Sequence, residues 1–144
     1  MQFQDYDIIK KIGEGAQGVV HLAADKRLGR KVAIKSLHSN LITNNTQKER
    51  FIGEAKLLSQ LDHTSVVTLF DYIADANGSH LIMEFVDGLP LDDLINKISG
   101  PIQELRAIEI ILQVLKGIQH IHSRNIVHRD IKPENLVFDE HGYL

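Results

Sequence analysis

The stretch GEGAQGVV, residues 13–20, decides between two folds that bind phosphate groups. It holds Gly13, Gly15 and Gly18 in a G-x-G-x-x-G pattern. Alone the pattern is weak, because clustered glycines often mark only a hairpin turn. In a dinucleotide-binding fold the third glycine begins a helix, whose N-terminus holds the pyrophosphate. Here two β-branched valines follow, so the sequence favours a strand–loop–strand flap over that helix.

A flap of this kind can bind a nucleotide, because glycines let the backbone approach phosphate closely. No G-K-[ST] follows it, which excludes a P-loop. Downstream, VAIK (32–35) places Ala33 and Lys35 on one face of a strand, since successive side chains alternate. A small residue beside an adenine ring with a cation farther along suits ATP. The simpler alternative is a surface strand with an exposed lysine.

Glu54, on a helix after this strand, is the natural anion to hold Lys35 if that lysine lies in an apolar cleft. The alternative is that Glu54 is an ordinary solvent-exposed residue of the helix.

The flanking segments predict an antiparallel sheet joined by hairpins. Two turns, RLGR at 27–30 and DANGS at 75–79, carry Gly29 and Asn77-Gly78, which tolerate the positive φ of tight turns. The expected strands, rich in β-branched, leucine and aromatic residues, are 6–12, 19–25, 31–37, 66–74 and 80–86.

The first expected helix spans residues 46–61. Thr46 and Glu49 have the spacing of a capping box. Apolar residues then recur at helical spacing. They are Phe51, Ala55, Leu58 and Leu61.

The second expected helix spans about residues 102–122, with Pro101 suited to its first turn. Its expected apolar face consists of Leu105, Ile108, Leu112, Leu115 and Ile118. A joint rich in glycine and proline, EFVDGLP (84–90), separates a mostly β half ending near residue 86 from a helical half.

The composition of the 144 residues is that of a globular chain, with 43% hydrophobic and 24% charged residues. A net charge of −3 gives no electrostatic case for nucleic acid or an acidic membrane. The absence of cysteine excludes disulfides and cysteine-ligated metals and fits a reducing compartment, so we expect a cytoplasmic location. No secretory signal and no membrane-spanning run stands within the chain.

The segment HRDIKPEN (128–135) has the composition of a catalytic loop. Asp130 can accept a hydrogen bond from an alcohol, and Lys132 can neutralise a phosphoryl group during transfer. Pro133 stiffens the loop.

Taken in order, GEGAQGVV, VAIK, Glu54 within FIGEAKLL, MEFV and HRDIKPEN resemble the eukaryotic-type protein kinase family over essentially the whole chain. The resemblance implies an α+β, protein-kinase-like fold. Residues 1–86 would form the N-lobe, an antiparallel five-stranded sheet with one helix. Residues 87–144 would hold the end of the hinge and an incomplete helical C-lobe with the catalytic loop.

The resemblance also implies the site. Asp130 and Lys132 would be catalytic, and Asn135 would ligate Mg²⁺. Lys35 would hold the α- and β-phosphates of ATP and pair with Glu54, while Met83 would guard the back of the adenine pocket. The remaining ATP-binding residues would be Ile12, Gly13, Gly15, Gly18, Val20, Ala33, Glu84, Val86 and Val137.

Lys132-Pro133 is typical of the serine/threonine branch of the family, so the implied partners are ATP and a protein substrate with serine or threonine. Arg129 resembles kinases that respond to phosphorylation of the activation loop, or forms a structural ion pair. The flap tip, Ala16-Gln17, lacks the aromatic residue of many relatives, which suggests looser coverage of the phosphates.

The chain stops at Leu144, after a stretch that resembles the hairpin before the D-F-G motif. We therefore expect an incomplete kinase domain, inactive as 144 residues alone. The alternatives are a non-catalytic nucleotide- or partner-binding kinase-like module and, more distantly, a nicotinamide oxidoreductase.

Overall fold

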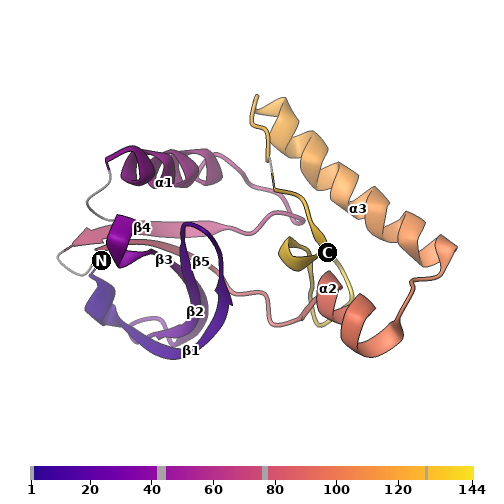
Figure 1. The fold of residues 1–144 in the computed structure, drawn as a ribbon, viewed down its shortest axis with the longest axis horizontal. Helices are drawn as coiled ribbons and strands as arrows, with labels where there is room; N and C mark the ends of the chain where they lie inside the picture. The colour runs from indigo at the N-terminus through magenta and orange to yellow at the C-terminus, as the bar shows by residue number, and fades with distance from the viewer. Residues whose placement is uncertain (1, 42–44, 76–77, 129) are drawn as a thin grey trace. The chain divides into compact units, whose positions relative to one another are not determined.

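The computed structural model describes residues 2–41, 45–75, 78–128 and 130–144. Figure 1 shows the order of the elements along the chain. The strands are β1 (Tyr6–Glu14), β2 (Gly18–Asp25), β3 (Arg30–Leu37), β4 (Leu69–Asp75), β5 (Gly78–Glu84), β6 (Leu89–Pro90) and β7 (Val137–Phe138). The α-helices are α1 (Asn45–Leu58), α2 (Leu91–Asp93) and α3 (Glu104–Ser123). Short 3-10 or π segments are η1 (Phe3–Asp5), η2 (Ser39–Leu41), η3 (Leu94–Ser99) and η4 (Pro133–Asn135).

The described chain divides into two compact units. The first consists of Met1–Gln60 with Thr68–Phe85, and the second of Leu61–Val67 with Val86–Leu144. No helix among the described residues is long and apolar enough to cross a membrane.

The first unit contains the predicted antiparallel sheet. Within its described residues, five strands pair in the order β1-β2-β3-β5-β4, and each neighbouring pair is antiparallel. The turn glycines have the predicted positive φ, 65° at Gly29 and 134° at Gly78, whereas Asn77 lies outside the described residues. β4 begins at Leu69, later than predicted, and β5 already ends at Glu84.

The two faces of this sheet bury different residues. In the register, Ala33 lies opposite Met83 and Lys35 opposite Leu81, so the predicted shared face of Ala33 and Lys35 is confirmed. α1 covers this face, as Figure 1 shows, and its Phe51 packs in a core cluster with Leu81. On the other face, Val32 and Ile34 of β3 belong to a second buried cluster. Its other buried members come from the remaining strands and are Tyr6, Ala23, Ile73 and Ile82.

The limits of α1 differ from the prediction at both ends. The helix begins at Asn45, so Thr46 lies inside the first turn and is not the residue before the helix. It ends at Leu58, and the N–H of Gln60 donates to the carbonyl of Leu57, an i→i−3 bond typical of a terminating turn. Leu61 is buried as expected, but it lies beyond the helix, in the second unit.

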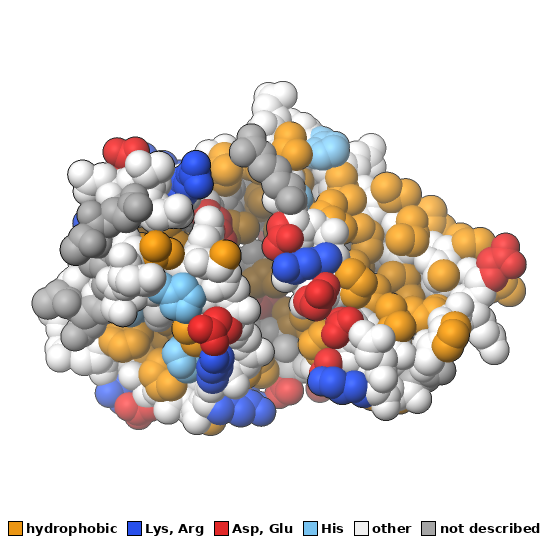
Figure 2. Space-filling model, viewed as in Figure 1, with side chains coloured by type: hydrophobic (Ala, Val, Ile, Leu, Met, Phe, Trp, Pro, Cys, Tyr) orange, Lys and Arg blue, Asp and Glu red, His pale blue; other side chains and the backbone are white. Residues whose placement is uncertain are grey.

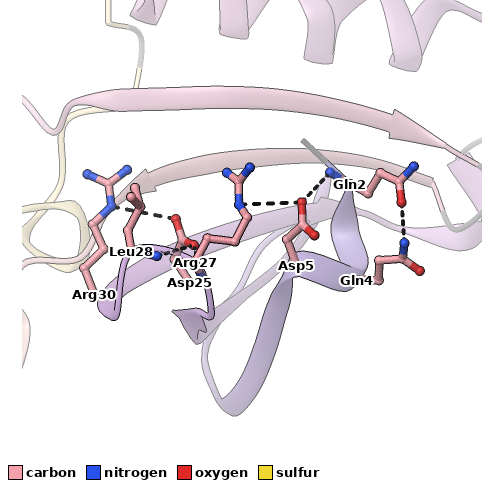
Figure 3. A network of polar contacts seen from close by, with 7 residues as sticks. All are labelled: Gln2, Gln4, Asp5, Asp25, Arg27, Leu28 and Arg30. Carbon is pink, nitrogen blue, oxygen red and sulfur yellow. Dashed lines mark hydrogen bonds and ion pairs between the residues drawn. The ribbon is translucent and has the colours of Figure 1, made fainter.

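Asp25 closes the turn between β2 and β3 (Figure 3). Its carboxylate is buried and accepts hydrogen bonds from the N–H groups of Arg27 and Leu28, at 3.0 and 3.2 Å. Arg30 Nε lies 4.0 Å from the other oxygen, and its guanidinium stacks 3.8 Å over the ring of Phe70. A buried carboxylate needs such donors and a nearby cation, so this aspartate is part of the hairpin's structure.

The second unit packs α3 against the short β6–β7 pair and α2. Its buried cluster consists of Leu91, Ile110, Val114 and Phe138. Gly117 also faces inward, because a Cβ there would stand 3.2 Å from the carbonyl oxygen of Ser65. The position of α3 therefore depends on the small Gly117 as well as on the large apolar residues of the cluster.

The predicted apolar face of α3 is wrong for most of its length. Ile118 packs against the core, but Leu105, Ile108, Leu112 and Leu115 are exposed, and apolar side chains gather over α3 in Figure 2. The helix has apolar residues on most of its circumference, so periodicity could not identify the buried side. Pro101 was also misplaced: the helix begins at Glu104, after Gln103 at its N-cap.

Candidate functional site

The glycine flap connects two strands, as the sequence predicted. Gly13 lies near the end of β1, Gly18 begins β2, and the N–H of Gly15 donates to the carbonyl of Gly18 at 2.9 Å. No helix begins at Gly18, so the dinucleotide-binding alternative is excluded.

The three glycines have different surroundings. A Cβ at Gly18 would stand 2.1 Å from the carbonyl oxygen of Ser36, so the close approach of β3 requires glycine there. At Gly13 a Cβ would make only ordinary contact with Val20, and at Gly15 it would meet nothing within 4 Å. The backbone at Gly15 is therefore open on that side, as a flap that binds phosphate must be.

Lys35 and Glu54 are brought together by β3 and α1. Lys35 Nζ donates to both carboxylate oxygens of Glu54, at 2.6 and 2.9 Å. The side chains are 22% and 33% exposed, so the pair is largely shielded from water, which strengthens it over a surface ion pair. An ammonium has three donors, and one remains beyond the two directed at Glu54. The alternative of an exposed surface lysine is excluded by this contact.

The predicted adenine-site residues of the first unit lie on the sheet around Lys35. Val20 is opposite both Gly13 and Lys35 in the register, and Ala33 is buried opposite Met83. The others are Ile12, an exposed residue of β1, and Glu84, the last residue of β5. The N–H of Glu84 is bonded to the carbonyl of Thr68, at 2.8 Å.

The residues predicted to form a catalytic loop, which belong to the second unit, also lie together. Asn135 Nδ2 donates to the carboxylate and to the backbone carbonyl of Asp130, at 2.9 and 2.8 Å, and Lys132 Nζ lies 3.5 Å from the carboxylate. Pro133 begins η4, a turn that returns Asn135 to Asp130. The hydrogen bond from Asn135 lowers the pKa of Asp130, and the nearby Lys132 lowers it further. Asp130 is thus an anion at neutral pH.

Val86 and Val137 lie in the second unit. Val137 belongs to β7 and pairs with Pro90 of β6. Arg129 lies outside the described residues.

Two residues near these groups were not predicted. His38, which follows β3, contacts the flap backbone. Gly88 has no room for a side chain, because a Cβ would stand 1.6 Å from the carbonyl oxygen of Phe138. The glycine within VDGLP was a signal for Gly88, whereas no motif marks His38.

Comparison with known proteins agrees with this geometry. Residues 6–144 match the model of the protein kinase domain family, and the chain belongs to that family. It is 40% identical to the serine/threonine-protein kinase pkn2 of Myxococcus xanthus and 38% identical to the serine/threonine-protein kinase PrkC of Bacillus subtilis. A third relative is the serine/threonine-protein kinase PknD of Protochlamydia amoebophila, at 32% identity.

These alignments cover 91%, 96% and 99% of the chain. The chain in turn spans only 16%, 21% and 16% of the three relatives. The family and its kinase-like α+β fold are therefore established for this segment.

Proposed function

We propose that this chain is the ATP-binding and catalytic-loop part of a serine/threonine protein kinase, with residues 1–86 as its N-lobe. The observation that supports it most is the bidentate contact between Lys35 and Glu54. The contact holds a largely shielded cation on the sheet face that also bears Ala33, beside the strand that leaves the glycine flap.

The residues fit ATP and Mg²⁺. The remaining donor of Lys35 suits a phosphate oxygen, and the open space beside Gly15 leaves room for a phosphate to approach the flap. The amide of Asn135 directs its nitrogen to Asp130, which leaves the carbonyl oxygen as the atom that suits a hard cation. When bound, Mg²⁺ would neutralise charge on the phosphates during transfer.

Asp130 has the electrostatic character of an orienting group. Because its pKa is lowered, it is a weak base and accepts a hydrogen bond from the substrate hydroxyl more readily than a proton. Lys132 supplies positive charge near the same carboxylate and would compensate the transferring phosphoryl group. Alignment and charge compensation are what a loose phosphoryl-transfer transition state needs most.

The test uses the full-length protein with ATP, Mg²⁺ and a generic serine- and threonine-containing protein. We expect Lys35→Met and Asp130→Asn each to lower phosphorylation roughly 10²-fold or more. Lys26→Met, in a surface ion pair with Asp7, is the matched control for Lys35→Met and should retain activity.

Near-normal rates for Lys35→Met or Asp130→Asn would contradict the proposed roles. ATP binding without phosphorylation by the wild-type protein would support the non-catalytic module instead.

A further inference from the structure

His38 donates two hydrogen bonds to the glycine flap, on either side of Ala16. Its backbone N–H donates to the carbonyl of Gln17 at 3.0 Å. Its ring Nε2 lies 3.0 Å from the carbonyl oxygen of Gly15. A carbonyl oxygen can only accept, so Nε2 carries the proton in this contact.

The carbonyl of Gly15 determines where the next N–H points. The described peptide bonds are trans, and in a trans peptide the C=O of one residue and the N–H of the next point in opposite directions. Holding the Gly15 carbonyl on His38 therefore directs the N–H of Ala16 away from His38. Within the described part of the chain, that N–H has no hydrogen-bond partner. It is a backbone donor available to an anion.

Neighbouring contacts hold the same part of the flap. Gly18 lies against the carbonyl of Ser36, two residues before His38. Glu14 Oε1 lies 4.0 Å from His38 Nε2, while its other oxygen pairs with Lys11. The imidazole is half-buried, with 27% of the side chain exposed, whereas Gly15 itself is exposed.

We propose that His38 is a positioning residue: it holds the Gly15 peptide so that the Ala16 N–H is oriented for a nucleotide phosphate before the nucleotide binds. This inference rests on the proposed function and adds a residue to it. Its physical basis is pre-organisation, because a flap that is already ordered loses less conformational entropy on binding.

The first experiment measures amide hydrogen exchange in residues 14–18 of the full-length protein without nucleotide. His38→Ala removes the ring donor, whereas His38→Gln retains an amide donor. We expect exchange in the flap to become several-fold faster in His38→Ala and to return toward the wild-type rate in His38→Gln. The control is His21→Ala on β2, whose register partners are Lys11 and Ile34.

The second experiment measures kcat and the KM for ATP in the same variants. We expect His38→Ala to raise KM about two- to fivefold with kcat nearly unchanged, the size of one partly exposed hydrogen bond. His38→Gln should restore most of the affinity. A loss of stability alone would not raise KM while leaving kcat nearly unchanged. Thermal unfolding of each variant shows whether its stability has fallen.

Unchanged flap exchange in His38→Ala, or an equal effect in His21→Ala, would overturn the inference. So would a fall in kcat at constant KM. If the wild-type protein bound no ATP, the proposed function would fail separately, while the exchange measurement would still decide whether His38 orders the flap.

Discussion

At the scale of single residues, the glycines of one motif occupy sites that differ in the space they leave for a side chain. Gly18 has no room for a side chain beside Ser36, whereas Gly15 has open space. Sequence reasoning treats them alike, because both belong to the same pattern. Only their neighbours separate a glycine required by packing from one that leaves space for a ligand.

We therefore predict that Gly18→Ala lowers the free energy of unfolding by about 1–3 kcal/mol, because strand β3 must shift to admit the methyl group. Gly15→Ala is the matched substitution. It should leave stability unchanged or slightly raised but weaken ATP binding. Urea unfolding and nucleotide titration of both variants check this. Equal stability of the two would contradict the packing argument.

At the scale of elements, η1 is held on the sheet by an aromatic stack. The rings of Phe3 and His80 lie 4.0 Å apart at an interplanar angle of 20°, and His80 Nδ1 lies 2.8 Å from Ser36 Oγ. His80 is 4% exposed, and this burial lowers its pKa below the usual 6.5. Asp75 opposes the shift more weakly.

This pKa predicts loss of stability in mild acid. The unfolded chain takes up a proton near pH 6.5, before the folded protein does, so the contribution of His80 is complete above that pH and declines below it. We expect the free energy of unfolding to fall as the pH drops below about 6.5, by up to about 1.4 kcal/mol per pH unit from this group, until the folded protein also takes up the proton. His80→Gln should remove this part of the slope, whereas His122→Gln, at an exposed position of α3, should keep it. Urea unfolding across the pH range measures it; equal slopes in the two variants would contradict the assignment.

Helix α1 offers a second prediction at this scale. Gly53 lies inside the helix, and a Cβ there would meet nothing within 4 Å. Gly53→Ala should therefore stabilise the protein by about 0.5–1 kcal/mol through helix propensity. Gly29→Ala is the contrast, because its site is equally open but its φ is 65°. Gly29→Ala should therefore lower the stability. Thermal unfolding of both variants shows whether the space for a side chain or the backbone conformation determines the effect of the substitution.

At the scale of the whole molecule, the outer face of α3 exposes a row of large apolar side chains. Leu105, Ile108, Leu112 and Leu115 are each about half or more exposed, whereas Ile110 and Val114 of the same helix are buried in the cluster of the second unit. An apolar surface of this kind promotes association.

For residues 1–144 expressed alone, we predict concentration-dependent self-association that Ile108→Lys with Leu112→Lys reduces without lowering the unfolding temperature. Ile110→Ala, on the buried side, should instead destabilise by about 2–5 kcal/mol. Sedimentation and thermal unfolding check these results. An equal loss of stability in the lysine variant would show that the outer face is packed in solution.

The antiparallel sheet, its order along the chain and the shared face of Ala33 and Lys35 could all be predicted from the sequence. Strand alternation, turn glycines and motif spacing are local properties, so neighbouring residues are enough to specify them. The contact between Lys35 and Glu54 was also predictable as a hypothesis, because a shielded ammonium needs an anion.

Two features were decided only by the tertiary structure: the buried side of α3 and the contacts of His38 with the flap. Both depend on residues that are distant in the chain. The buried side of α3 follows from Phe138, Leu91 and the close approach of Ser65 to Gly117, which no helical periodicity contains. The hydrogen bonds of His38 to the flap follow from the antiparallel pairing of β2 with β3, which brings residue 38 beside residues 15 and 17. Local sequence specifies conformation and alternation, but the side of an element that is buried, and the backbone that a side chain reaches, are determined by packing between elements.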